Sequence, residues 1–305
     1  MEKNKTVLRQ RIEAGKSLLL AEISPPHGSD STALRQAAKR FAGKVHSLGV
    51  SDNRDRVAMS ALAAASIVAG EGVEPILHIV TRARTRIALV SAALGAQALG
   101  IGNLLCTSGT HQVLGPYRSA KNVYDIDTVQ LLKTYANLAD DGSLVGEKDF
   151  AGTALFCLGA VAAPYADPVE MQVSKLAKKI EAGASYIITQ PVYDLDRFNQ
   201  WWQEITRRGL HEKVAFMAGI RPLLDVKEAQ ELAASRPSPR IPEAVLTRLS
   251  SASGAAAQRA AGIAVALETI KKLANVKGLR GFQICADGDV DAVVEIIEKS
   301  ALDTK

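Results

Sequence analysis

The chain has 305 residues, of which 47% are hydrophobic and 23% charged, a composition typical of a globular enzyme. Its 37 basic and 32 acidic residues give a net charge of +5, without the long basic blocks and interleaved aromatic residues of a nucleic-acid-binding protein. The N-terminus lacks the apolar core of a signal peptide, and no segment approaches the roughly 18 apolar residues of a membrane span. We therefore expect a cytoplasmic protein that contacts neither nucleic acid nor membrane.

Short apolar runs alternate with longer amphipathic segments along the whole chain. The short runs predict buried strands at residues 18–23, 49–52, 74–80, 103–107, 154–161, 186–192, 214–220 and 281–286. The longer segments predict helices at residues 31–47, 57–69, 85–98, 126–138, 168–182, 195–207, 226–234, 242–275 and 290–300. Residues 140–152, with three glycines and mixed charge, predict a loop before the fifth strand.

Eight strands, each followed by a helix, favour a single (β/α)₈ TIM barrel over an open sheet. We expect one domain over residues 1–305, with residues 1–16 as an N-terminal extension that contains a helix. Functional side chains of such barrels lie at the C-terminal ends of the strands. The strand ends are Glu22, 52–53, His78, 107–110, 160–164, Gln190, 219–222 and 286–287.

Glu22 is the most informative of these residues. It ends the apolar run 17–23, and Pro25 and Pro26 stop the strand immediately afterwards. A lone carboxylate costs several kcal/mol to bury unless it is protonated or hydrogen-bonded. A helix cap or an ion pair would stabilise the Glu22 carboxylate without any catalytic role. In a pocket, the same carboxylate could have a catalytic role.

The remaining signals are structural. Three cysteines lie in or next to apolar runs without Cys-x-x-Cys spacing, so we expect buried thiols and no disulfide or zinc site. No strand end carries a metal triad, and we expect no metal. Trp201 and Trp202 lie on a predicted helix and indicate packing or an oligomer contact.

Five short motifs lie in order at the strand ends. They are Ala21-Glu22-Ile23-Ser24-Pro25-Pro26, Val50-Ser51-Asp52-Asn53, Glu74-Pro75-Ile76-Leu77-His78, Ile188-Thr189-Gln190-Pro191-Val192-Tyr193-Asp194 and Ala218-Gly219-Ile220-Arg221-Pro222-Leu223. Together they make the chain resemble the methylenetetrahydrofolate reductase family, in its short bacterial form that consists of the catalytic barrel. The resemblance spans residues 18–297.

The resemblance implies FAD-dependent reduction of 5,10-methylenetetrahydrofolate to 5-methyltetrahydrofolate, a step of one-carbon metabolism that serves methionine biosynthesis. Glu22 matches the family's general acid, which protonates a folate nitrogen as the five-membered ring opens. That role requires a protonated carboxyl group, which apolar surroundings favour. Gln190 matches the amide that hydrogen-bonds the pterin.

Other positions match the family's flavin contacts and one further folate contact. The implied FAD contacts are Ser51, His78, Ser108, Gly109, Thr110, Ala162, Lys175, Lys178 and Lys179, with Thr110 also facing the folate. A solvated helix face is an equally good interpretation of the three lysines. The electron donor is NADH, NADPH or a redox partner protein, and we expect a homo-oligomer or a complex with a partner subunit.

The chain departs from the family after the fourth strand, where Ser108-Gly109-Thr110-His111 replaces the usual Gly-Asp pair. The aspartate normally bonds the pterin and lies near flavin N1. Threonine brings no charge, so folate loses a charge-assisted hydrogen bond of about 1.5–3 kcal/mol and the flavin becomes easier to reduce. The alternative function is therefore a flavin-free or partner-dependent folate-binding paralogue. A barrel aldolase would need a Schiff-base lysine, and no strand end offers one.

Overall fold

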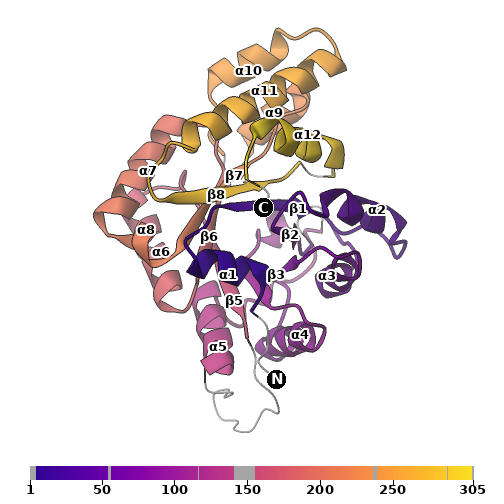
Figure 1. Ribbon diagram of the computed structural model, residues 1–305, viewed down its shortest axis with the longest axis vertical. Helices are drawn as coiled ribbons and strands as arrows, with labels where there is room; N and C mark the ends of the chain where they lie inside the picture. Colours follow the sequence, from indigo (N-terminus) through magenta and orange to yellow (C-terminus); the bar gives the residue numbers. More distant parts are fainter. Residues whose placement is uncertain are drawn as a thin grey trace.

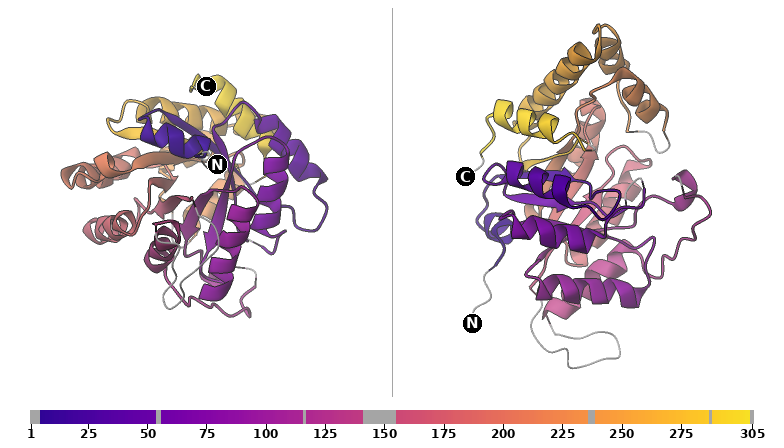
Figure 2. Two further views of the ribbon diagram at one scale, coloured as in Figure 1. Left: turned by 60° about the horizontal axis from the view of Figure 1, so that its bottom comes forward. Right: turned by 90° about the vertical axis from the view of Figure 1, so that its right-hand side faces the viewer.

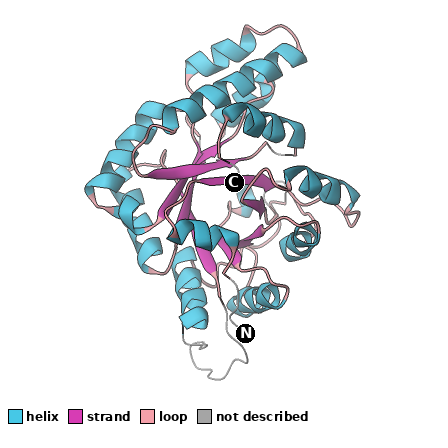
Figure 3. Ribbon diagram, in the orientation of Figure 1, coloured by secondary structure: helices cyan, strands magenta, loops and turns pink. Residues whose placement is uncertain are grey.

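The computed structural model describes residues 5–53, 56–115, 117–140, 155–235, 239–286 and 288–303. Eight parallel strands close into a barrel in the order in which they occur along the chain (Figures 1 and 3). The strands are β1 (Leu18–Ile23), β2 (Ser47–Val50), β3 (Pro75–Val80), β4 (Asn103–Thr107), β5 (Cys157–Ala162), β6 (Tyr186–Pro191), β7 (Ala215–Ile220) and β8 (Leu279–Ile284). The predicted (β/α)₈ barrel is confirmed.

Helices surround the strands on the outside, as both views in Figure 2 show. They are α1 (Val7–Glu13), α2 (Thr32–Phe41), α3 (Ala61–Gly70), α4 (Arg86–Ala98), α5 (Thr128–Asp140), α6 (Val169–Glu181), α7 (Leu195–Arg207), α8 (Leu210–Lys213), α9 (Val226–Ala234), α10 (Glu243–Ser250), α11 (Ala255–Leu273) and α12 (Val290–Ser300). A short 3₁₀ helix, η1 (Gln112–Leu114), follows β4. None of these helices is long and apolar enough to cross a membrane.

Three predicted helices were wrong in extent, and the one expected over 57–69 begins at Ala61. The helix expected over 31–47 ends at Phe41, because Gly43 turns the chain at φ +71° and Ser47 already begins β2. The helical region expected over 242–275 is two helices, separated at Gly254, whose φ of +86° lies outside the helical range. Most of the loop expected at 140–152 lies outside the described residues.

Side chains of each strand alternate between the helix layer and the bore of the barrel. On β1, Leu19, Ala21 and Ile23 belong to the large cluster that contains the buried helix residues. Leu18 and Leu20 belong to a second cluster made of strand residues and Leu8 of α1, which fills the bore. The same parity directs Glu22 into the bore, above Leu20.

Helix α1 closes the N-terminal end of the bore. The Glu74 carboxylate, just before β3, accepts hydrogen bonds from the backbone N–H groups of Val7 at 2.6 Å and Leu8 at 2.9 Å. Ser47 Oγ at 3.0 Å and Asn103 Nδ2 at 2.8 Å donate to the same carboxylate. Glu74 thus joins α1, β2, β3 and β4 at one point.

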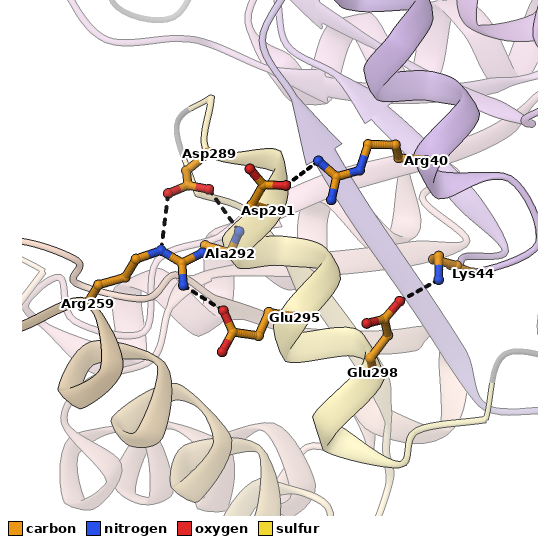
Figure 4. A network of polar contacts seen from close by, with 8 residues as sticks. All are labelled: Arg40, Lys44, Arg259, Asp289, Asp291, Ala292, Glu295 and Glu298. Atoms are coloured by element: carbon orange, nitrogen blue, oxygen red, sulfur yellow. Dashed lines mark hydrogen bonds and ion pairs between the residues drawn. The ribbon is translucent and has the colours of Figure 1, made fainter. Parts of the chain in front are cut away.

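A separate network fixes α12, the last helix, to its neighbours (Figure 4). Arg259 of α11 pairs with Glu295 at 2.6 Å and Asp289 at 3.7 Å. Arg40 at the end of α2 pairs with Asp291. These pairs are partly exposed, so each contributes little alone. Together they set where α12 lies against α2 and α11.

We expect Glu74→Ala to lower the free energy of unfolding by about 2 kcal/mol, because several donors around the bore lose their acceptor. Urea denaturation measures the change. Glu13→Ala is the matched control on α1, since Glu13 makes exposed pairs with Lys5 and Arg9 and its loss should change the free energy of unfolding far less. Equal effects of the two substitutions would contradict this account of Glu74.

Candidate active site

A pocket of about 470 Å³ lies at the C-terminal ends of the barrel strands. Six of the residues predicted from the sequence line it, namely Glu22, Ser51, His78, Gly109, Thr110 and Gln190. Its apolar wall includes Val80, Leu105, Val161 and Ile188. Strand ends far apart in the sequence therefore meet at one concave site, as barrel topology predicts.

Glu22 is held in the pocket by Gln283, a residue that the sequence analysis missed. Gln283 lies in β8, is 5% exposed, and donates from Nε2 to Glu22 Oε2 at 2.8 Å. Its register opposite Leu20 places it in the bore beside β1. A glutamine within an apolar strand was the available signal, because a buried amide requires a polar partner.

Gly49 makes room for this polar layer. It pairs in register with Glu22 across β1 and β2. A Cβ atom at this position would lie 2.9 Å from His78 Nε2 and 3.4 Å from Gln283 Nε2. A larger residue would therefore push His78 and Gln283 out of their positions in the bore.

Gln190 enters the pocket from an irregular part of β6. The pairing of β6 with β7 shifts register between Ile188 and Pro191. Thr189 Oγ1 stabilises the irregularity by accepting from Gly219 N at 3.0 Å and donating to Gln190 O at 2.8 Å. Within the described residues the Gln190 side-chain amide makes no hydrogen bond, so its donor and acceptor are available to a ligand.

Charged residues organise the side of the pocket formed by β2, β3 and β4. Asp52 is 5% exposed and accepts from Arg84 Nη2, with a closest N–O distance of 3.0 Å, and from Val80 N at 3.3 Å. Arg82 donates from Nη2 to Asn53 O at 3.0 Å and from Nη1 to Thr110 O at 2.9 Å. These contacts tie together the segments that follow three neighbouring strands.

The backbone of the β4 loop needs glycine at position 109. Gly109 has φ +74°, and a Cβ atom there would lie 2.5 Å from Val80 Cγ1. The resulting turn leaves the side chains of Ser108 and Thr110 exposed. Thr110 lines the pocket and Ser108 does not.

The remaining predicted flavin contacts lie outside the pocket lining. Ala162 packs in the helix layer, whereas its neighbour Val161 faces the pocket. Lys175 and Lys178 are exposed on α6. Lys179 instead turns inward and donates from Nζ to Val161 O at 2.8 Å. Burial lowers the pKa of Lys179 to about 8.

The cysteines are free and buried, as predicted. Burial raises the pKa of Cys106, and it raises that of Cys157 to about 12, so both thiols stay protonated and inert. Cys285 lines the pocket. The described residues contain no group of three histidine, cysteine or acidic side chains that could hold a metal ion. Trp201 and Trp202 are both buried and pack against Phe216, which confirms a packing role.

The lowered pKa of Lys179 predicts a pH dependence of stability. The folded chain binds fewer protons than the unfolded chain between pH 8 and the unfolded pKa of 10.5, so the free energy of unfolding rises with pH in this window. We expect this rise to be on the order of 1–3 kcal/mol larger in the wild type than in Lys179→Met. Denaturation at pH 7.5 and 10 measures it. Lys178→Met, at an exposed position, is the control and should behave like the wild type. If the free energy of unfolding of Lys179→Met rises with pH as much as that of the wild type, the lowered pKa of Lys179 is refuted.

Known proteins are similar to this chain in sequence and in fold. A family model for methylenetetrahydrofolate reductase matches residues 7–301. Methylenetetrahydrofolate reductase 2 of Saccharomyces cerevisiae is 32% identical over 74 residues, which cover 22% of this chain and 12% of the yeast protein. Methylenetetrahydrofolate reductase 1 of Schizosaccharomyces pombe is 29% identical over 72 residues, with the same coverage.

A solved structure extends the similarity of fold over the whole barrel. It is a protein from Clostridium thermocellum described as binding two copies of 5-methyl-5,6,7,8-tetrahydrofolic acid, with a TM-score of 0.67 and 12% identity. The alignment covers 96% of this chain and 98% of that one. Identity this low shows a shared fold alone, and it is the family model, matched over nearly the entire barrel, that carries the assignment. The chain belongs to the methylenetetrahydrofolate reductase family.

Proposed function

We propose that this protein reduces 5,10-methylenetetrahydrofolate to 5-methyltetrahydrofolate with FAD as its cofactor. The observation that carries the proposal is the meeting of Glu22 and the Gln190 amide in one pocket at the barrel mouth. Membership of the reductase family supports it, and so does the C. thermocellum protein described as binding the methyl product.

The residues of the pocket fit a flavin lying across the barrel mouth. The wall is apolar, as a flat aromatic ring requires, and the turn at Gly109 brings backbone close to the cavity. Arg82 Nε is buried and has no hydrogen-bond partner among the described residues. Ser51 and His78 would contact the flavin ring. Lys175 and Lys178 are exposed and would be available to the phosphates of FAD. Bound FAD would supply the hydride that converts the methylene carbon to a methyl group.

Glu22 would act on the folate as a general acid. Its position in the bore puts the carboxyl group beneath a ligand in the pocket, where it can deliver a proton to the ring nitrogen as the C–N bond opens. Gln283 holds the Glu22 side chain through the 2.8 Å hydrogen bond and acts as a positioning residue. Gln190 would hydrogen-bond the pterin edge with its amide donor and acceptor.

An absorption spectrum of the purified protein tests the proposed function. After incubation with FAD and desalting, we expect flavin bands that a reductant bleaches and that 5,10-methylenetetrahydrofolate restores. Supplying NADH, NADPH or a reduced redox protein in turn identifies the donor. A chain that stays colourless yet binds methyltetrahydrofolate would instead be a flavin-free folate-binding paralogue, the alternative that uncharged Thr110 favours.

Glu22→Gln should keep FAD bound and lower the rate of methylenetetrahydrofolate reduction by at least about 100-fold, because the amide cannot donate the required proton. Stopped-flow reoxidation of the reduced protein by the substrate measures this rate. Glu268→Gln, on outer helix α11, is the matched control and should retain the wild-type rate. Full activity in Glu22→Gln would remove Glu22 from the mechanism.

Thr110→Asp tests the effect of the uncharged loop. A carboxylate at the pocket edge should tighten folate binding by roughly tenfold through a charge-assisted hydrogen bond and should make bound FAD harder to reduce. Isothermal titration and potentiometry measure the two effects. Thr110→Asn, which has similar size without the charge, should reproduce neither, and unchanged affinity and potential in Thr110→Asp would contradict the role of this position.

A further inference from the structure

Arg82 is a buried cation that has no acidic partner among the described residues. It is 5% exposed and lines the pocket just after β3. In the described part of the chain its guanidinium contacts two backbone carbonyls, those of Asn53 and Thr110, and forms no ion pair. Its Nε atom is buried and has no hydrogen-bond partner.

The neighbouring arginine is different. Arg84 lies two residues further on and pairs with the Asp52 carboxylate, so the charges of that pair balance. A guanidinium group presents only N–H donors, so it cannot accept a hydrogen bond from its surroundings. Among the residues that the structure describes, neutral carbonyls accept from two of the Arg82 N–H groups and no carboxylate pairs with its positive charge. A negative charge supplied by a ligand would compensate it.

The position of Arg82 in the pocket indicates which part of a ligand would supply the negative charge. Arg82 joins the segments after β2, β3 and β4, whereas Glu22 and Gln283 lie on β1 and β8. The pocket therefore has a fixed cation on one side and a proton donor on another. A two-electron-reduced flavin carries its negative charge at the N1–C2=O edge, and a cation at this edge favours the reduced form.

We infer that Arg82 is the residue that binds the N1–C2=O edge of the flavin and stabilises the negative charge of its reduced form. This inference rests on the proposed FAD-dependent function and adds the orientation of the ring. The pyrimidine end of a bound flavin would lie against the side of the pocket formed by β2, β3 and β4, which would leave Glu22 and Gln190 for the folate. Thr110 is uncharged and does not neutralise Arg82, so the guanidinium can attract the negative charge of a reduced flavin.

The test uses the FAD-loaded protein and the variants Arg82→Gln and Arg82→Lys. Sulfite is the probe, because its sulfur adds to flavin N5 and the displaced electron pair becomes negative charge at N1–C2=O. Arg82→Gln should weaken sulfite binding at least tenfold, and Arg82→Lys, which keeps the charge, should stay within about threefold of the wild type. Arg248→Gln has the same change in net charge on outer helix α10, where Arg248 pairs with Glu268, and should leave sulfite affinity unchanged.

A second readout compares the affinities of the wild type and Arg82→Gln for oxidised and reduced FAD. The wild type should prefer reduced FAD, and Arg82→Gln should lose at least tenfold of this preference, a shift of about 30 mV for a two-electron couple. If Arg82 only links the loops, Arg82→Gln would weaken both forms equally and leave sulfite binding to the retained flavin unchanged, which would overturn the inference.

Other outcomes separate this inference from the proposed function. A wild type that binds FAD but prefers the oxidised form would overturn the inference and leave the proposed function intact. This measurement needs no variant, so the inference stays testable even if Arg82→Gln does not fold. A wild type that binds no FAD would overturn both.

Discussion

The hydrogen bond between Gln283 and Glu22 closes the polar layer on which the pocket is built. The two side chains come from β8 and β1, the last and first strands, so the bond forms where the barrel closes on itself. Gly49 keeps the space that this layer needs. A carboxyl group is thereby held in the bore, with an amide partner that offsets the cost of its burial.

Two polar layers with different functions lie at opposite ends of the same bore. At the N-terminal end, the Glu74 carboxylate receives hydrogen bonds from α1 and from neighbouring strands and anchors the helix that closes the barrel. Leu18, Leu20 and their neighbours separate this end from the pocket. The C-terminal layer borders the pocket, which agrees with the division of barrels into a stabilising and a functional face.

Two kinds of contact hold the segments around the pocket: an ion pair between side chains, and hydrogen bonds from an arginine to backbone carbonyls. Asp52 and Arg84 neutralise each other and fix the β2 end to the β3 segment. Arg82 links the next loop through backbone carbonyls and has no acidic partner in the described part of the chain. The Asp52–Arg84 pair thus shapes the mouth of the barrel. Arg82 gives the mouth a positive edge that can orient an anionic ligand.

Local patterns in the sequence were enough for the architecture. Apolar runs of strand length, each followed by an amphipathic helix, predicted the barrel, and the rule that strand ends carry the chemistry selected Glu22 and Gln190. Helix ends that depend on a backbone turn were less predictable, because Gly43 and Gly254 interrupt segments whose periodicity alone indicates a continuous helix.

Contacts between distant residues required the tertiary structure. The sequence could not pair Glu22 with Gln283, 261 positions away, or show that Arg82 reaches the carbonyls of two other loops. It also could not separate Lys179, which is turned inward onto β5, from the exposed Lys178 beside it. The physical reason is the same in each case. Composition and periodicity fix which face a residue occupies, whereas charge balance and hydrogen bonding depend on neighbours that barrel closure brings together.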